Sequence, residues 1–377
     1  MLTKLTYSEF EGDPRSWTFG PCDFVEHNLV VGRNATGKTR LINVINGLCQ
    51  LISGKRAALF LSGTYSAEVN IGNQYYCLYL SFKDNEVVSE NLTVNGEERL
   101  SRNENGEGNL YYEGEDKFLS FKIPKNVLAL QTRRDALQHS YIAKLGDWAQ
   151  SCQQFKFGSS LGHDKLLTVQ ALRDNGNLEL DKHVVSVYLK GYEKYKKRLD
   201  KGVLRDMAYI GYELSEVGVG DTQSLSPHLN LNLPDTALCL FASEADRKKS
   251  RISQLDMSQG MFRALAIVIS LNLAVLSKFE GLVLIDDIGE GLDYDRSTKL
   301  IELIRMRLRG GVQTVLTTND RFVMNVVPLD NWCLLRRVGD HVQAITQRSH
   351  PSDFENFKFA GLSNFEFFKS ELIEGHQ

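Results

Sequence analysis

The residues with the clearest chemical pattern lie near the start of the chain, between Gly32 and Thr39. This stretch reads G-x-x-x-x-G-K-T and follows the apolar run Leu29–Val31. Apolar residues at three-to-four spacing follow in 40–48, so strand, glycine loop and helix come in the order that a phosphate-binding loop requires. This context disfavours the alternative, an ordinary glycine turn. The predicted nucleotide-binding residues are Gly32, Arg33, Asn34, Ala35, Thr36, Gly37, Lys38, Thr39 and Arg40.

These residue types have separate roles at a phosphate. Gly32 and Gly37 permit backbone angles and a close approach that a Cβ atom would prevent, so successive N–H groups can point at phosphate oxygens. The start of the following helix adds the positive end of a dipole. Lys38 would reach the β- and γ-phosphates, and the Thr39 hydroxyl would ligate Mg²⁺. We therefore predict ATP and Mg²⁺ as cofactors.

A second chemical pattern lies far downstream, where Gly281–Asp287 reads as a β-strand that ends in two carboxylates. In this arrangement Asp286 would hold the Mg²⁺ shell and Asp287 would orient the attacking water. A buried strand that ends in an ordinary acidic turn is the alternative. The phosphate-loop pattern upstream favours the metal and water roles.

The composition sets limits on the class of protein. The chain has 377 residues, 42% hydrophobic and 24% charged, enough for one elaborated domain or two. A formal net charge of −3 excludes a strongly basic nucleic-acid protein, although local basic patches remain possible. The six cysteines form no C-x-x-C pair, so neither a zinc site nor a disulfide framework is indicated.

The location of the protein is predicted from the same observations. Residues 1–7 alternate like a strand and lack the apolar core of a signal peptide. The most apolar run, 264–276, is too short to span a bilayer and is predicted as a buried helix. We expect a cytoplasmic protein without a membrane partner.

The elements that must position these motifs fall into three predicted segments. Residues 1–125 form the N-terminal part of an ATPase lobe, in which short β-type runs and turn clusters between 57 and 124 predict an antiparallel meander. Residues 126–235 form a helical insertion lobe, introduced by a core strand at 126–131 and including an expected loop at 214–237. Residues 236–377 complete the ATPase lobe.

Two further features allow two interpretations each. Basic residues gather at 190–201 and at 247–251, as solvated helix faces or, less favoured, as a contact for DNA or RNA. The tail contains six phenylalanines, for which docking on the core is favoured over a partner-protein surface. These are Phe354, Phe357, Phe359, Phe365, Phe367 and Phe368.

Taken in order, the motifs resemble those of ABC-type ATPase heads, as in SMC proteins, double-strand-break repair ATPases and bacterial anti-phage ATPases of the OLD-like AAA family. The resemblance implies an α/β P-loop NTPase fold, here with a β-meander and a helical insertion lobe. The stretch 257–261 aligns with the L-S-G-G-Q signature and keeps Ser258 and Gly260. In such a head Ser258, Gln259 and Gly260 would contact a γ-phosphate held by another subunit, and Asp293 would be the D-loop acid that contacts that subunit.

The chain departs from the family pattern at several positions. Asp287 stands where a catalytic glutamate is usual and is one methylene shorter, with Glu290 as the fallback base. Asn319 stands where a switch histidine is usual; its amide can donate a hydrogen bond but cannot carry charge. Gln131 is the candidate Q-loop ligand for Mg²⁺, against a buried or turn residue.

The resemblance leads to one expected function and two rivals. We expect an ATPase that forms a head-to-tail homodimer on ATP and works in DNA repair or anti-phage defence with an effector protein, a nuclease or a toxin. A slow or non-hydrolysing nucleotide-gated scaffold is the first rival, favoured by Asp287 and Asn319. A transporter cassette is the second, opposed by the meander, the N-terminal strand and the degenerate signature.

Overall fold

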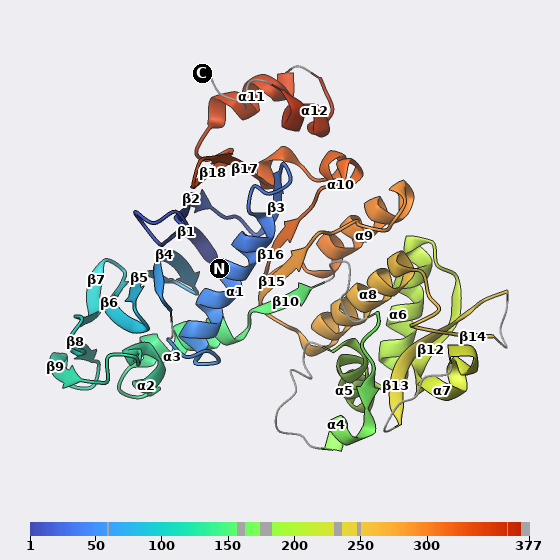
Figure 1. Cartoon of the computed structure of the whole chain (residues 1–377), viewed down its shortest axis with the longest axis horizontal. Helices are drawn as coiled ribbons and strands as arrows, with labels where there is room; N and C mark the ends of the chain where they lie inside the picture. The colour runs from blue at the N-terminus through green and yellow to red at the C-terminus, as the bar shows by residue number, and fades with distance from the viewer. Residues whose placement is uncertain are drawn as a thin grey trace.

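The computed structural model describes residues 1–58, 60–156, 163–173, 183–229, 236–246, 250–359 and 361–370. Within them, one large sheet of 14 strands runs through the protein and a smaller sheet lies to one side (Figure 1). Helices cover both faces of the large sheet, and its strands alternate between two cores. Val30 faces the core that contains the helix after the phosphate loop, whereas Leu29 and Val31 face the other core.

The large sheet is parallel at one end and antiparallel at the other. The parallel strands lie side by side in the order β10, β15, β16, β3 and β17. Their bounds are Gln153–Lys156, Gly281–Asp286, Val312–Thr317, His27–Gly32 and Trp332–Val338. β18 (His341–Thr346) pairs antiparallel with β17 and parallel with β2 (Trp17–Asp23), which connects the parallel end to the antiparallel end.

The antiparallel end contains the predicted meander, which continues the same sheet. From β2 the order is β1, β4, β5, β6, β7, β8 and β9. Their bounds are Leu2–Glu9, Ser62–Ile71, Gln74–Lys83, Glu86–Val94, Glu97–Arg102, Glu107–Tyr112 and Lys117–Lys122. Two hairpins turn at Asp84-Asn85 and Asn95-Gly96, where both central residues have positive φ, as two-residue turns between twisted strands require.

One face of the large sheet packs on α1 (Lys38–Ser53), α2 (Ala129–Thr132) and α3 (Ser140–Gln150). The predicted strand at 126–131 is wrong, because these residues lead into the short helix α2. The cause is a long-range contact: the buried carboxylate of Glu90 on β6 accepts hydrogen bonds from the N–H groups of Ala129 and Leu130, both at 2.8 Å. This carboxylate caps the helix from another part of the chain.

The other face packs on α8 (Gln259–Ser277), α9 (Tyr294–Arg307), α10 (Arg321–Val326), α11 (Pro351–Phe359) and α12 (Asn364–Lys369). α8 is long and apolar enough to cross a membrane, but 67% of its apolar window is buried inside the protein, as expected of a core helix. In the tail, Phe354, Phe357 and Phe367 are buried in this core, with Phe365 and Phe368 packed against it. The predicted docking of the tail on the core is confirmed for these side chains.

The smaller sheet packs on α5 (Val184–Tyr195) and α6 (Lys197–Ile210), and these two helices separate it from α8 (Figure 1). This sheet consists of β11 (Leu167–Thr168), β13 (Ala237–Glu244), β12 (Leu214–Asp221) and β14 (Arg251–Ser253). The helices in the same part of the chain range from short to long. They are α4 (Val169–Arg173), α5, α6, α7 (Thr222–Leu225) and the 3-10 turn η2 (Pro227–Leu229), while a second 3-10 turn, η3 (Leu329–Asn331), precedes β17.

This arrangement differs from the predicted segments. The loop expected at 214–237 contains β12, so that prediction is wrong for 214–221. β10 belongs to the large sheet and α3 packs on this sheet, although both lie within 126–235. α8 packs on α5 and α6 although it lies after 236. The exposed lysines of 190–201 lie on α5, on α6 and at the junction between them, and 247–249 lie outside the described residues.

Candidate functional site

The predicted site is assembled at one edge of the large sheet. The strands β3, β16 and β15 are parallel neighbours, so their carboxyl ends meet at the same edge. The phosphate loop follows β3, the acid pair ends β15, and Asn319 follows β16. Sequence segments far apart along the chain are therefore brought together where α/β sheets commonly bind ligands.

The phosphate loop is held by its own backbone. The Lys38 ammonium donates to the carbonyl oxygens of Gly32 and Arg33, at 2.8 and 3.2 Å, and the Thr36 hydroxyl also donates to Arg33 O, at 2.8 Å. Gly37 has a φ of 104°, and a Cβ on Gly32 would meet Thr36 Oγ1 at 2.6 Å. Gly37 is thus required by its backbone angle, and Gly32 by the close approach of Thr36.

Lys38 faces the acid pair. Its side chain is buried, and burial lowers the pKa of its ammonium, while the nearby carboxylates of Asp287 and Asp286 oppose this shift. The loop tip at 33–35 is exposed, as is Thr39. A buried cation beneath an open loop can neutralise a phosphate bound there.

Thr317 organises the two carboxylates, and the sequence reasoning missed it. Its hydroxyl donates to Asp286 Oδ1 at 2.6 Å and accepts from the backbone N–H of Asp287 at 2.8 Å. The available signal in the sequence was a threonine at the last position of β16, and the structure shows that its side chain is fully buried.

Asp287 and Asn319, the two departures from the family pattern, are in contact. The amide nitrogen of Asn319 donates to Asp287 Oδ1 at 3.3 Å. Asp287 has a φ of 50°, an uncommon conformation for a residue other than glycine. Burial raises the pKa of Asp287, aided by Asp286 and Glu290 and opposed by Lys38 and Arg263. A half-buried carboxylate of raised pKa beside the predicted phosphate loop is suited to orient water and accept a proton.

The signature residues begin α8. Ser258 is the N-cap, and its hydroxyl oxygen accepts a hydrogen bond from Met261 N at 3.2 Å. Ser258 and Gln259 are exposed. Gly260 is buried against the loop after Asp287, because a Cβ there would lie 2.1 Å from Gly291 O. The predicted signature and the predicted D-loop of one chain are therefore packed together.

Asp293 has a structural task within its own chain. It caps α9 by accepting a hydrogen bond from Arg296 N at 3.0 Å and forms an ion pair with the Arg296 side chain. The hydrogen bond from Arg296 N lowers the pKa of Asp293. Its carboxylate remains half exposed, so it can also face a second molecule.

Two predicted site residues have side chains that bind other parts of the protein. The Arg40 guanidinium lies over the Trp17 ring at 4.2 Å and pairs with Glu9. Gln131 donates to Leu51 O at 2.8 Å and Arg56 O at 2.9 Å, which places it at the C-terminal end of α1. Since the phosphate loop meets the other end of this 16-residue helix, about 20 Å away, Gln131 is not placed to ligate Mg²⁺.

The remaining oxygen ligands fit Mg²⁺. Asp286 offers one carboxylate oxygen that Thr317 does not engage, and Thr39 offers an exposed hydroxyl. Mg²⁺ takes few protein ligands and completes its shell with phosphates and water. Within the described part of the chain, no group of three or more His, Cys, Asp or Glu side chains is placed to hold a metal ion.

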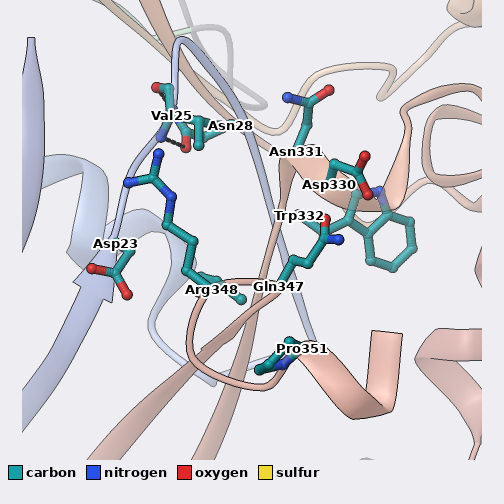
Figure 2. A pocket seen from close by; sticks show the side chains of 10 residues that line it. Asp23, Val25, Asn28, Asp330, Asn331, Trp332, Gln347, Arg348 and Pro351 are labelled. Atoms are coloured by element: carbon teal, nitrogen blue, oxygen red, sulfur yellow. Dashed lines mark hydrogen bonds between the residues drawn. The ribbon is translucent and has the colours of Figure 1, made fainter. Parts of the chain in front are cut away.

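A cavity elsewhere on the sheet is separate from this site. It has a volume of about 370 Å³ and lies at the opposite edge, where β3 and β17 begin (Figure 2). Asp23, Asp330 and Arg348 are among its lining side chains, and none of the predicted site residues lines it.

The fold is that of an α/β P-loop NTPase head, similar to the heads of SMC proteins, which confirms the predicted fold class. Residues 28–325 match the family described as AAA domain, putative AbiEii toxin, Type IV TA system, and the chain belongs to that family. No curated protein sequence matches the chain.

Two solved structures show the similarity of fold. The SMC head bound to the C-winged helix domain of ScpA has a TM-score of 0.53 and 13% identity, over 91% of this chain and 96% of that one. The Smc head domain with an extended coiled coil, bound to the C-terminal domain of ScpA and derived from Pyrococcus furiosus, has a TM-score of 0.50 and 11% identity, over 95% and 100%.

Proposed function

We propose that this protein binds and hydrolyses ATP and that two copies pair head-to-tail, with each nucleotide between the phosphate loop of one subunit and Ser258–Gly260 of the other. The observation that carries the proposal is the convergence of Lys38, Asp286 and Asp287 at one sheet edge. The family of P-loop ATPase heads to which the chain belongs supports it.

Each residue would have a defined part in hydrolysis. Lys38 would exchange its carbonyl partners for the β- and γ-phosphates, while Thr39 and Asp286 would hold Mg²⁺, which neutralises phosphate charge when bound. Asp287 would orient the attacking water. The Asn319 amide has two hydrogens, so it can hold Asp287 with one and donate to the γ-phosphate with the other.

The signature residues at the start of α8 explain why two subunits would pair. Ser258 uses its oxygen to cap α8, which leaves the hydroxyl hydrogen to donate outward. The exposed start of this 19-residue helix also carries the positive end of the helix dipole. Both features suit a γ-phosphate that a second subunit presents, and we infer that ATP closes the dimer and hydrolysis opens it.

The test of this proposal is ATP turnover by Lys38→Ala, with the exposed lysine variant Lys83→Ala as the matched control. We expect Lys38→Ala to lose ATP binding or turnover, because the cation aimed at the phosphates is gone, and Lys83→Ala to retain both. Parental turnover in Lys38→Ala would refute the proposed site.

Pairing is tested with Ser258→Arg. This variant should bind ATP normally but fail to dimerise with ATP in light scattering, and it should lose turnover. Mixing it with an equal amount of Lys38→Ala should restore activity in part, since the mixed dimer has one intact composite site. A Ser258→Arg protein that still dimerises would refute the head-to-tail arrangement.

We further propose a role in defence, with a toxin or nuclease as effector. The family description, which names a putative AbiEii toxin and a type IV toxin–antitoxin system, supports this over DNA repair. The test is capture of partners by the tagged protein from its own host, with and without ATP. A toxin or nuclease in the captured material supports defence. Repair proteins there, or turnover stimulated by double-stranded DNA, would favour repair.

A slow or non-hydrolysing nucleotide-gated scaffold is the second candidate. The shortened acid Asp287 and the neutral Asn319 favour it, because both change the groups around the attacking water. ATP-dependent dimerisation without single-turnover hydrolysis would identify the scaffold.

A further inference from the structure

The loop that carries Asp287 has a strained backbone that requires support. Asp287, Gly289 and Gly291 have φ values of 50°, 92° and 80°, and such a conformation costs about 1 kcal/mol or more at a residue other than glycine. β16 and the residue that follows it hold the first half of the loop: Ile288 N donates to Thr317 O, and the Thr318 hydroxyl donates to Ile288 O, both at 2.8 Å. Both of these hydrogen bonds are made by Ile288, and neither involves residues 289–291, the second half of the loop.

Arg263 holds the second half of the loop. This arginine lies on α8, five residues after Ser258, and only 7% of its surface is exposed. Its guanidinium donates to the backbone oxygen of Glu290 at 2.7 Å and forms an ion pair with the Glu290 carboxylate at 3.0 Å. A buried guanidinium that engages both the backbone and the side chain of one residue restrains it more strongly than a single contact would.

The same part of α8 touches the loop a second time. Gly260 packs so closely on Gly291 that no Cβ fits between them, and Arg263 lies on the next turn of the helix. The helix start that would contact the partner's nucleotide is therefore joined to the loop that carries Asp287 of its own chain. A displacement of one would move the other, because packed elements shift as units.

We propose that Arg263 is a positioning residue that keeps the loop 287–291 in the shape that aims Asp287, and that connects this loop to the signature of the same subunit. The inference rests on the proposed function. Ligand contact at Ser258–Gly260, at one composite site, would be transmitted through Arg263 to the water-orienting carboxylate at the other site of the dimer.

The first test compares Arg263→Gln and Arg263→Lys, with the exposed variant Arg309→Gln as the matched control. We expect Arg263→Gln to lower kcat by about 10- to 100-fold, with KM within about threefold and with ATP-dependent dimerisation retained, because the carboxylate is misplaced but the nucleotide contacts remain. Arg263→Lys keeps the charge and can still donate hydrogen bonds from its ammonium, so it should recover part of the rate. Arg309→Gln should match the parent.

The second test shows where Arg263 acts. When Ser258→Arg is mixed with Lys38→Ala, the Lys38→Ala subunit supplies an intact signature and turnover returns. Mixing Arg263→Gln with Lys38→Ala should not restore turnover, since the only working phosphate loop is then in the subunit whose own Asp287 loop is loosened. The opposite result, recovery equal to that of Ser258→Arg, would overturn the inference and place the defect in the signature.

Two other outcomes are distinguishable. Parental kcat in Arg263→Gln would overturn this inference and leave the proposed ATPase standing. If the parent protein itself neither hydrolyses ATP nor dimerises with it, the proposed function fails, and the role of Arg263 fails with it. If Arg263→Gln does not fold, the same comparison is made with Arg263→Lys, for which parental kcat would likewise overturn the inference.

Discussion

Glu90 gives a pH dependence of stability that can be worked out from the structure. Its side chain is completely buried on β6, and both carboxylate oxygens accept backbone N–H groups of α2. Burial raises the pKa of Glu90 from 4.5 to about 7, although the two hydrogen bonds and Arg102 oppose the shift. The perturbation we consider is Glu90→Gln, which cannot ionise.

The sign follows from proton binding. Between pH 4.5 and 7 the folded protein keeps this proton while the unfolded chain has released it, so the free energy of unfolding falls as pH rises through this window. A difference of about 2.5 pKa units, at about 1.4 kcal/mol per unit, gives a loss of about 3 kcal/mol that is complete above pH 7. Glu90→Gln removes this contribution.

The assay is urea unfolding of both proteins from pH 4.5 to 8. The stability of the parent relative to Glu90→Gln should fall by about 3 kcal/mol across this range, whatever the absolute difference at the lower end. A difference between the two proteins that stays constant with pH would refute the reasoning. It would mean that the folded protein holds Glu90 ionised throughout and that its two backbone hydrogen bonds outweigh burial.

Three further predictions concern the site and its supports. Gln131→Leu should lower the free energy of unfolding by about 1–3 kcal/mol, because the hydrogen bonds to Leu51 O and Arg56 O are lost, and should leave the Mg²⁺ dependence of ATP binding unchanged. A weakened Mg²⁺ dependence would restore the predicted role of Gln131 as a ligand. Asp287→Asn should keep ATP binding, stabilise the closed dimer and lower kcat by about 100-fold or more; the parental rate would direct attention to Glu290. Gly260→Ala should lower both the melting temperature and turnover, because the new Cβ would meet Gly291 O at 2.1 Å. A variant as stable as the parent would contradict this packing.

Features set by neighbouring residues in the chain were predictable from the sequence. The strand, loop and helix around Lys38 depend on local spacing, and the meander hairpins depend on Asp84-Asn85 and Asn95-Gly96. The carboxyl ends of parallel strands share an edge, so the meeting of the phosphate loop with Asp286 also followed from the pattern.

Features set by distant contacts were not predictable. The helix at 129–132 is capped by a carboxylate from β6 rather than by a neighbouring residue. A loop is predicted at 214–237 because this stretch mixes Ser, Gly and Pro without a sustained period. In β12, however, the Phe241 ring on the paired strand β13 covers Gly218, where a Cβ would lie 2.7 Å from it. The role of Gln131 is predicted from its position at the end of a strand, 126–131, that does not form.

The two departures from the family pattern are better understood together than one by one. A glutamate at 287 would be one methylene longer than the aspartate whose Oδ1 accepts a hydrogen bond from the Asn319 amide at 3.3 Å, so it would change this contact. The aspartate side chain is short, and the backbone N–H of Asp287 donates to the Thr317 hydroxyl. Because the residue is held in this way, the neutral Asn319 amide can bind Asp287 Oδ1 without a charged partner. We therefore infer that Asp287 and Asn319 function as a pair. Changing only one, to glutamate or to histidine, should lower turnover more than changing both, and a double-variant cycle that shows simple additivity would contradict this pairing.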